Sequence, residues 1–479
     1  MLCNNYSMLC DFYQLTMGNG YYKTKHADRI AYFDLFFRRV PDGGGYAVCA
    51  GLEQVIEYIE NLKFSDEDID FLRSKKIFSE EFLEYLKNFR FEGDVFAIPE
   101  GTPVFPNEPL ITVRAPAIQA QLIETMLLLL VNHQSLIATK ASRIVRAAEG
   151  RAISEFGSRR AQGTAGALLG ARAAYIGGCS GTACVMADEQ FGIPSTGTMA
   201  HSWVQMFDSE LDAFEEYCRV YPNSAVLLVD TYNVLKSGVP NAIRAFDKIL
   251  KPLGARPVGI RLDSGDIAYL SIEARKMLDA AGYPDCKIIA SNSLDEHIIR
   301  DLIKQGARID SFGVGERLIT ASSEPVFGGV YKLCATEDNG VITPKIKISE
   351  NVIKVTNPHY KKIYRIFDNK TGKAEADLLC VYDEKIDESK PLELFDPDYT
   401  WKRKTVEDFT VKELQVPIFI KGRRVYQPPK IEEIKSYCAA QLDTLWETVL
   451  RFENPHTYYV DLSQKLWNIK HKLLADKGE

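Results

Sequence analysis

The sequence predicts an α/β protein whose central part is a parallel α/β barrel. Short strand-like runs recur along the middle of the chain, and a helical pattern follows most of them. Their starts lie about 20 to 30 residues apart, which is the length of one strand and one crossover helix. The chain has 479 residues, too many for one core, so we expect two to three domains. A doubly wound parallel sheet is the main alternative, and periodicity alone does not distinguish the two.

Seven strand-like runs carry the barrel prediction. They are residues 152–159, 173–178, 193–201, 225–230, 257–263, 287–292 and 308–313. In a parallel α/β sheet the carboxyl ends of such strands meet at one edge, where ligands bind. The residues at these ends are therefore the candidates for a functional site.

The N-terminal part of the chain mixes strand and helix signals. Residues 30–37 are aromatic and β-branched, which favours a strand. Residues 52–62 have helical spacing, and Ser65, followed by three acidic residues, is typical of a helix start. A long amphipathic helix is expected over residues 117–146.

Beyond about residue 340 the pattern changes again. Residues 345–373 alternate charged and β-branched side chains, as an antiparallel sheet with one wet face would. Helices are expected over residues 431–450 and 461–479. We therefore divide the chain into residues 1–117, 118–340 and 341–479.

Composition excludes several classes of protein. The apolar fraction is 46% and the charged fraction 26%, as in soluble globular proteins. A net charge of −7 argues against a general nucleic-acid binder. The longest apolar run, residues 126–131, is far shorter than a membrane span, and the first residues show no signal-peptide pattern. Ten cysteines with no CxxC pair indicate reduced thiols in a cytoplasmic protein and no zinc site.

The charge is unevenly distributed along the chain. Residues 140–172 hold seven basic side chains against Glu149 and Glu155, a local charge of 7 − 2 = +5. This excess indicates a small anionic ligand, although we expect Arg143 and Arg146 to lie on a solvated helix face.

The predicted strand ends carry a mixed polar set. Its members are Arg159, Arg160, Ser180, His201, Ser202, Asp230, Arg261, Asp263, Asp266, Asn292, Gly313 and Gly315. Arginines suit anions, and carboxylates suit a divalent metal or sugar hydroxyls. This mixture fits a phosphorylated sugar and an acidic aromatic ring better than a peptide or a lipid.

Each member also has a purely structural interpretation. Arg159 and Arg160 could form surface salt bridges, His201 could be a hydrogen-bonded structural histidine, and residues 263–266 could be a helix cap and turn. Gly313 and Gly315 begin a GxGxxG pattern that lacks its third glycine, which argues against a dinucleotide fold but allows a backbone phosphate cradle.

Six motifs occur together and in order. They are DFYQLTM (11–17), EFGSRRAQG (155–163), GTMAHS (197–202), RLDSGD (261–266), SNSLD (291–295) and GGVYKL (328–333). In these motifs the chain resembles the nicotinate phosphoribosyltransferase family, and the likeness extends to residues 454–462. It implies an irregular parallel α/β barrel with an open β-rich sandwich domain formed by both chain ends.

The resemblance also implies a reaction. Members of this family join nicotinate to 5-phosphoribosyl-1-diphosphate, giving nicotinate mononucleotide and pyrophosphate on the way to NAD. They are ligase-type pentosyltransferases that use Mg²⁺ and ATP, and they work as homodimers with shared active sites. Which residues would hold the Mg²⁺ is left open by the sequence.

Residue roles follow from matching positions. Tyr13 resembles the ring that stacks on nicotinate from the neighbouring subunit, and Phe156 resembles the ring on the other face. Arg159 would pair with the nicotinate carboxylate. Arg261 would reach the nicotinate and diphosphate, and Asp263 the ribose hydroxyls.

The remaining matched positions concern phosphate. Backbone amides around Gly313 and Gly315 would hold the 5-phosphate. The residue matching His201 is phosphorylated by ATP in this family, with Ser202 beside it, so the resemblance implies a phosphohistidine here. The nicotinate nitrogen is itself a nucleophile, so the transfer requires no general-base histidine.

Three other functions are weighed against this one. A nicotinamide-using relative would share the fold, but Arg159 favours an anionic ring. A catalytically silent paralogue would show degenerate motifs, and these are intact. A Schiff-base aldolase would need a lysine at a strand end, and none is there.

Overall fold

Two compact units make up the chain. The computed structural model describes residues 5–24 and 26–477. One unit combines residues 1–139 with 326–479, and the other comprises residues 140–325. Both chain ends therefore share one unit, as the resemblance implies. All cysteines in the described ranges have free thiols, and Cys3 lies outside them.

Strands from the two chain ends interleave in the first unit. The larger sheet has the order β13-β12-β1-β5-β3-β19-β20, with mostly antiparallel pairs. Its strands are β1 (Ile30–Phe36), β3 (Asp94–Ala97), β5 (Ile111–Pro116), β12 (Val330–Asp338), β13 (Val341–Pro344), β19 (Val416–Ile420) and β20 (Arg423–Arg424). Because β1 lies between β12 and β5, the N-terminal and C-terminal segments form one continuous sheet.

Smaller sheets complete this unit. A four-stranded sheet runs β18-β14-β15-β21, and two pairs, β16-β17 and β2-β4, stand apart from it. The strands are β2 (Ala47–Val48), β4 (Pro103–Val104), β14 (Lys361–Asp368), β15 (Ala374–Val381), β16 (Leu392–Phe395), β17 (Arg403–Val406), β18 (Phe409–Glu413) and β21 (Val460–Leu462). The antiparallel sheet expected over 345–373 begins only at residue 361, since most of 345–360 forms no strand.

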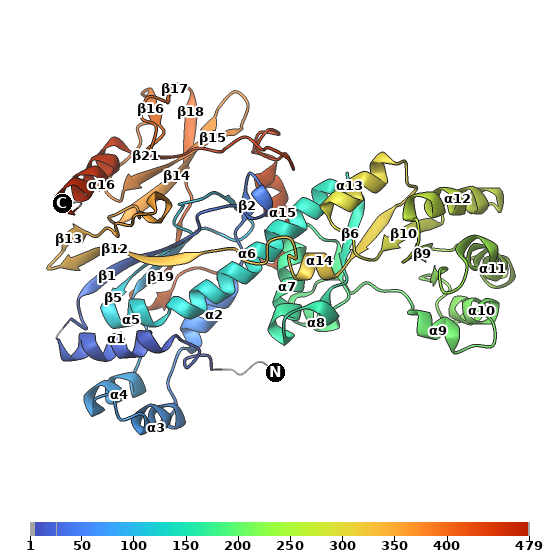
Figure 1. Cartoon of the computed structure of the whole chain (residues 1–479), viewed down its shortest axis with the longest axis horizontal. Coiled ribbons are helices and arrows are strands. Elements are labelled where there is room, and N and C mark those ends of the chain that lie inside the picture. The colour runs from blue at the N-terminus through green and yellow to red at the C-terminus, as the bar shows by residue number, and fades with distance from the viewer. Residues whose placement is uncertain (1–4, 25, 478–479) are drawn as a thin grey trace. The chain divides into compact units, whose positions relative to one another are not determined.

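Helices cover the sheets of the first unit. They are α1 (Phe12–Lys23), α2 (Leu52–Asn61), α3 (Asp66–Ser74), α4 (Glu80–Lys87), α5 (Ala117–Leu122), α15 (Ile431–Leu442) and α16 (Gln464–Lys477). The expected start at Ser65 is confirmed, because its hydroxyl accepts a 3.2 Å bond from the Asp68 N–H. Helix α1 packs on α5 (Figure 1).

The long helix expected over 117–146 is also confirmed, as α5 followed by α6 (Glu124–Ala147). By length and composition alone, residues 117–147 are apolar enough to cross a membrane. However, 67% of their most apolar window is buried inside the protein. Such burial is typical of a core helix.

Parallel strands form the second unit, in the order β7-β6-β11-β10-β9-β8. They are β6 (Ala152–Glu155), β7 (Gly181–Thr182), β8 (Val226–Leu228), β9 (Gly259–Leu262), β10 (Lys287–Ser291) and β11 (Ser311–Val314). Ser195 adds a parallel bridge to Thr182 beside β7. The strands thus follow chain order around an irregular barrel, with no pairing between Ser195 and β8 among the described residues.

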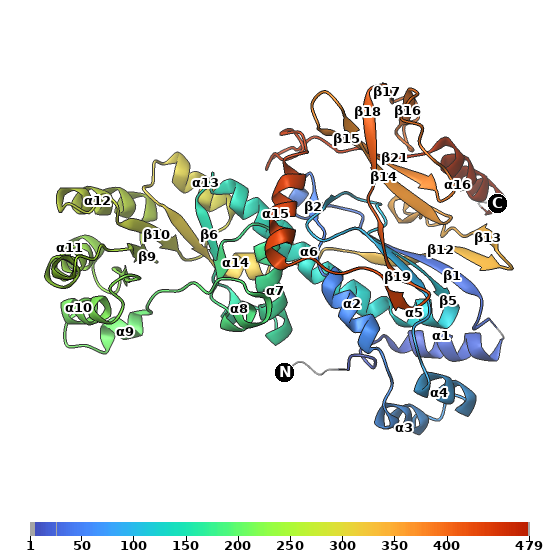
Figure 2. The ribbon, with the colours of Figure 1, turned by 180° about the vertical axis from the view of Figure 1, so that it is seen from behind.

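Helices form the outer layer of the second unit. They are α7 (Thr164–Ile176), α8 (Val185–Phe191), α9 (His201–Gln205), α10 (Glu210–Val220), α11 (Val239–Ala245), α12 (Ile267–Ala280), α13 (Glu296–Lys304) and α14 (Glu316–Ile319). Helices α10 to α12 lie outside strands β9 and β10 (Figures 1 and 2). Buried Phe214 and Phe246 from this layer join Leu227, Ile260 and Ile288 from the strands in one core.

Two of the seven predicted strands are wrong. Residues 173–178 end helix α7 and the turn after it, and the strand forms later, at β7. Residues 193–201 contribute only the bridge at Ser195. Short apolar runs such as AAYIGG fit a buried helix end as well as a strand, so periodicity misassigned them.

A buried ion pair joins distant segments of the first unit. Arg365 on β14 donates to both carboxylate oxygens of Asp377 on β15, at 2.9 and 2.7 Å, and both residues are fully buried. Arg365 also donates to the Pro103 carbonyl, and the Tyr458 hydroxyl donates to Asp377 at 2.9 Å. One guanidinium therefore connects the N-terminal segment with both C-terminal strands.

Replacing Arg365 with Met should destabilise the protein by about 3–5 kcal/mol, because Asp377 would stay buried without its counter-charge. Chemical unfolding of the full chain measures this. Arg29→Met is the control, since its ion pair with Asp338 is solvent-exposed and should contribute much less. Equal losses in the two variants would contradict the assigned role of Arg365.

Candidate functional site

Arg261 links several strand ends of the second unit. It lies on β9, and its Nε donates to the Ser291 hydroxyl at 2.8 Å. One terminal nitrogen donates to Thr198 at 3.0 Å and the other to Asp263 at 2.8 Å. The Ser291 hydroxyl also donates to the Asp263 carboxylate. The guanidinium is therefore held in one orientation by three segments.

His201 lies beside this group, at the start of α9. Its Nδ1 is 3.1 Å from the Thr231 hydroxyl, and its Nε2 is 3.9 Å from Asp263 Oδ2. The imidazole is partly exposed. It is thus oriented from one side, near a carboxylate, and accessible to a ligand.

Asp230 accepts hydrogen bonds from the loop that carries Asp263. Its Oδ2 accepts from the Asp263 backbone N–H at 3.1 Å and from the Ser264 hydroxyl at 2.6 Å. Its Oδ1 is buried and has no hydrogen-bond partner among the described residues. Buried carboxylate oxygens normally have partners, so this one is open to a ligand donor or a cation.

Phe156 packs close to Gly313. A Cβ on Gly313 would lie 2.5 Å from two Phe156 ring carbons, so only glycine leaves room for the ring. A Cβ on Gly315 would lie 2.9 Å from the Phe156 carbonyl oxygen. The Arg261 guanidinium carbon lies 5.7 Å from the ring centre, within the range of a cation–π contact.

Arg159 and Ser202 lie at the surface of the same unit. Arg159 is exposed, and its guanidinium makes no hydrogen bond or ion pair with any described residue. The neighbouring Arg160 lies 3.6 Å from Glu316. Ser202 is exposed next to His201.

Fewer basic side chains of residues 140–172 are available to a ligand than the local charge of this segment predicts. The expectation that Arg143 is solvated is wrong, because Arg143 and Lys140 are buried and both donate to Glu296, at 3.1 and 2.9 Å. Arg172 is fully buried. A glutamate more than 150 residues away balances charge that local counting leaves unpaired, and Arg159 remains the exposed arginine without a partner.

The other predicted strand-end residues have local roles. Asp266 caps α12 by accepting from the Tyr269 N–H at 3.1 Å, so the cap interpretation holds for it. Ser180 donates to the Ile153 carbonyl at 2.9 Å. Asn292 adopts a φ of +85° in the turn after β10.

Tyr13 belongs to the first unit and so is not placed relative to these groups. Its ring on α1 is 44% exposed, and its hydroxyl hydrogen-bonds to Glu124. Burial of the hydroxyl and the Glu124 charge together raise the pKa of Tyr13. The hydroxyl is anchored while a face of the ring remains available for stacking.

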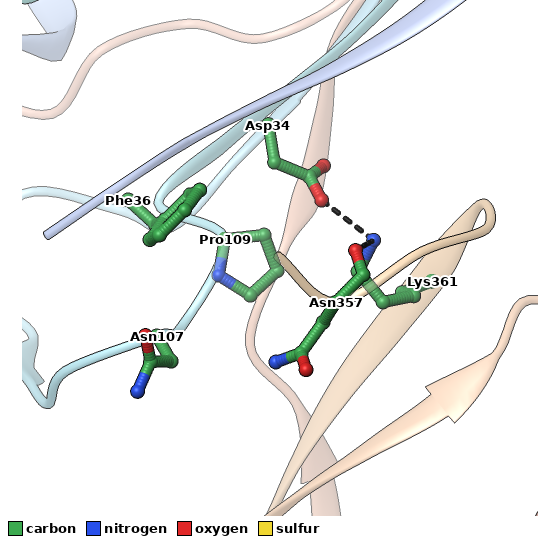
Figure 3. A pocket seen from close by; sticks show the side chains of 6 residues that line it. All are labelled: Asp34, Phe36, Asn107, Pro109, Asn357 and Lys361. Carbon is green, nitrogen blue, oxygen red and sulfur yellow. Dashed lines mark hydrogen bonds and ion pairs between the residues drawn. The ribbon is translucent and has the colours of Figure 1, made fainter. Parts of the chain in front are cut away.

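One pocket of the first unit has charged lining groups but does not form a ligand site. Its lining includes Asp34 and Lys361, which form an ion pair of 2.7 Å (Figure 3). The Lys361 ammonium also donates to the carbonyls of Asn357 and His359, and Thr112 donates to Asp34. These charges already have protein partners. Among residues 5–24 and 26–477, no group of three or more His, Cys, Asp or Glu side chains could hold a metal.

Several site residues were not singled out from the sequence. Thr198 and Ser291 bind Arg261, and Thr231 binds His201. All three lie within or beside the quoted motifs or strand ends, which was the available signal. Hydroxyls are common in such turns, so their position alone does not identify a role.

These features define a class of protein. A parallel α/β unit that carries the Arg261–Asp263 pair, His201 and the Phe156 ring near its strand ends is typical of an enzyme, because parallel α/β folds bind their ligands at the carboxyl ends of their strands. Three family models match: the nicotinate phosphoribosyltransferase N-terminal domain (residues 8–132), family (151–371) and C-terminal domain (360–470). The chain belongs to the nicotinate phosphoribosyltransferase family.

Individual relatives agree. A nicotinate phosphoribosyltransferase of Bacillus subtilis is 47% identical over 466 residues, covering 97% of this chain and 94% of the relative. One from Mycobacterium tuberculosis is 38% identical, covering 96% and 92%. The crystal structure of human nicotinic acid phosphoribosyltransferase superposes with a TM-score of 0.86 at 30% identity, covering 97% of this chain and 99% of that one.

Gly313→Ala should destabilise the protein by about 1–3 kcal/mol, because the added methyl group overlaps the Phe156 ring. Chemical unfolding measures the loss. Gly197→Ala is the matched control, since a Cβ there would meet no heavy atom within 4 Å. If both alanines cost the same, the close approach of Phe156 is not what requires glycine.

Proposed function

We propose that this enzyme transfers the phosphoribosyl group of 5-phosphoribosyl-1-diphosphate to nicotinate, giving nicotinate mononucleotide and pyrophosphate, as the first step of NAD salvage from nicotinate. Family membership supports this reaction. The observation that carries the choice of base is Arg159, an exposed arginine without a protein partner, three residues after the Phe156 ring. A carboxylate on a flat ring satisfies both groups.

Binding orients the base for attack. The Arg159 guanidinium would pair with the nicotinate carboxylate in a bidentate way, and Phe156 would cover one ring face. The ring nitrogen then points at the ribose C1 and needs no deprotonation. The contribution of these residues is orientation rather than proton transfer.

Charge develops as the bond between C1 and the diphosphate breaks. The sugar becomes oxocarbenium-like, and negative charge grows on the leaving pyrophosphate. Arg261, already fixed by Thr198 and Ser291, would stabilise the leaving group without reorganising. Asp263 would accept hydrogen bonds from the ribose hydroxyls.

Phosphate at the 5-position would lie near Gly313 and Gly315. The glycines at both positions make room for Phe156, so this backbone and the ring lie side by side. Their amides would supply the donors.

The residues present fit a Mg²⁺ ion bound together with pyrophosphate. Mg²⁺ usually takes one or two carboxylates and completes its shell with water and phosphate oxygens. Asp230 Oδ1 is buried without a partner, and Asp263 is partly exposed beside it. These two carboxylates would hold the ion, which supplies charge neutralisation at the leaving group.

We further propose that ATP phosphorylates His201 and that turnover of this phosphohistidine drives the transfer. Partial exposure and orientation by Thr231 support this role, and Ser202 is available beside it. In the cell we expect a cytoplasmic homodimer with shared active sites. The exposed, anchored ring of Tyr13 would then stack on the nicotinate of the other subunit.

A product assay tests the reaction. The enzyme is given 5-phosphoribosyl-1-diphosphate and Mg²⁺ with nicotinate, nicotinamide or quinolinate, with and without ATP. Nicotinate should be converted to its mononucleotide, faster with ATP, and pyrophosphate released. A clear preference for nicotinamide, or no pyrophosphate release with any base, would overturn the proposal.

Arg159→Ala should raise the KM for nicotinate about 10- to 100-fold, because a charge-assisted bidentate pair is lost. Arg159→Lys should restore little, since an ammonium lacks the planar fork. Arg160→Ala is the control, because its neighbour Glu316 already engages that guanidinium. A larger effect at Arg160 would assign the carboxylate to the wrong arginine.

His201→Ala should abolish ATP hydrolysis and acid-labile phosphorylation of the protein but leave some ATP-independent product. Labelled ATP followed by acid and alkali stability of the bound phosphate measures this. His297→Ala, an exposed histidine on α13, should behave as the parent. Full ATP coupling in the His201 variant would show that the phosphoryl group goes elsewhere.

A further inference from the structure

Glu155 is a buried carboxylate that none of the proposed steps uses. It is the last residue of β6 and is fully buried. Its Oε1 accepts from the Gly157 backbone N–H, and its Oε2 accepts from the Thr182 hydroxyl at 2.6 Å. Thr182 in turn accepts from the Cys184 N–H at 3.0 Å. One side chain thus connects the turn after β6 to β7.

Hydrogen bonds close to the end of β6 fix the turn that follows this strand. The Phe156 N–H donates to the Val314 carbonyl at 2.8 Å, and the Gly157 N–H donates to Glu155. The Arg160 N–H closes the turn by donating to the Gly157 carbonyl at 2.7 Å. Gly157 therefore takes part in two of the hydrogen bonds that fix this turn, one through its N–H and one through its carbonyl.

The position of Arg159 depends on the backbone around Gly157. Its guanidinium contacts no described residue through a hydrogen bond or ion pair, so no side-chain contact fixes its position. What locates it is the backbone of residues 157–160. A side chain anchors that backbone through the bond from the Gly157 N–H to the buried Glu155 carboxyl oxygen, in an environment without water where such a bond is strong.

We propose that Glu155 is a positioning residue for nicotinate recognition: its carboxylate fixes the turn at Gly157 and thereby places Arg159 at the substrate carboxylate. The inference rests on the proposed function of Arg159. It makes Glu155 a determinant of affinity for the acidic base and not of the phosphoribosyl donor.

The state of the carboxylate is consistent with this role. Burial raises the pKa of Glu155, and the bonds from Thr182 and Gly157 oppose that shift by favouring the charged form. A neutral amide can keep the contact with Gly157, while the direction of the hydrogen bond with Thr182 is reversed. Its oxygen accepts from Gly157, and its N–H₂ donates to the second lone pair of the Thr182 hydroxyl.

Three variants of Glu155 test the inference in the full-length enzyme. Glu155→Ala leaves Gly157 without its acceptor, and Glu155→Asp is one methylene too short to reach both partners. Both should raise the KM for nicotinate about tenfold or more, with kcat and the KM for 5-phosphoribosyl-1-diphosphate little changed. Glu155→Gln should stay close to the parent enzyme. If the alanine variant does not fold, the contrast between Asp and Gln decides.

A matched control separates positioning from simple loss of stability. Glu215 is also buried in the second unit, but it binds Lys248 and Arg219, away from the turn. Glu215→Ala should lower stability without a selective change in the KM for nicotinate. A parallel rise of both KM values in the Glu155→Asp variant, or a Gln variant as impaired as the Asp variant, would overturn the inference.

Arg159→Ala measured alongside distinguishes two failures. If it raises the KM for nicotinate and Glu155→Asp does not, the positioning role is wrong and the proposed recognition stands. If Arg159→Ala leaves that KM unchanged, the proposed role of Arg159 fails, and the positioning role fails with it.

Discussion

The hydrogen bonds of one guanidinium organise the strand ends of the second unit. Arg261 extends from β9 and donates to residues that lie before α9, after β9 and at the end of β10. Parallel strands bring these segments to one edge, but strand pairing alone does not fix the loops beyond it. Because all three guanidinium nitrogens of Arg261 donate hydrogen bonds, Asp263 and the guanidinium over the Phe156 ring have defined positions before any ligand binds.

Several charged groups that look available in the sequence have protein partners in the structure. Arg365 and Asp377 pair in the first unit, and Lys140 and Arg143 share Glu296 in the second. The net charge of −7 and the local excess of +5 therefore say little about binding. Two groups near the strand ends of the second unit lack a partner among the described residues, namely Arg159 without an acceptor and Asp230 Oδ1 without a donor, and these indicate a ligand. An anion and a cation or hydroxyl would complete these two groups.

Sequence patterns predicted the elements whose signals are local. The strands β8 to β10 lie within the predicted runs, β11 extends one residue beyond its run, and Ser65 caps α3 as its neighbours indicate. The run at 173–178 failed because its apolar residues face the core from a helix. The prediction that Arg143 is solvated failed for another reason. Its counter-charge, Glu296, is distant in sequence and becomes adjacent only in the folded chain. The order of the motifs singled out Arg261 and Asp263 as candidate site residues. The hydrogen bonds between Glu155 and Gly157 and between Thr231 and His201 depend on the folded structure, so the sequence did not indicate them.

The contrast between Arg159 and Arg261 follows from what each must do. In the proposed reaction Arg261 would meet charge that develops late, so reorientation during the reaction would cost free energy, and its three partners would prevent it. In the same proposal Arg159 would meet a charge that the substrate brings from solution. Its side chain must therefore stay unpaired until binding, because an internal carboxylate would compete with the ligand. An unpaired side chain can still be well placed if its backbone is fixed, and the buried bond between Glu155 and Gly157 achieves this without occupying the guanidinium. The turn after β6 thus combines a rigid base with a free binding group.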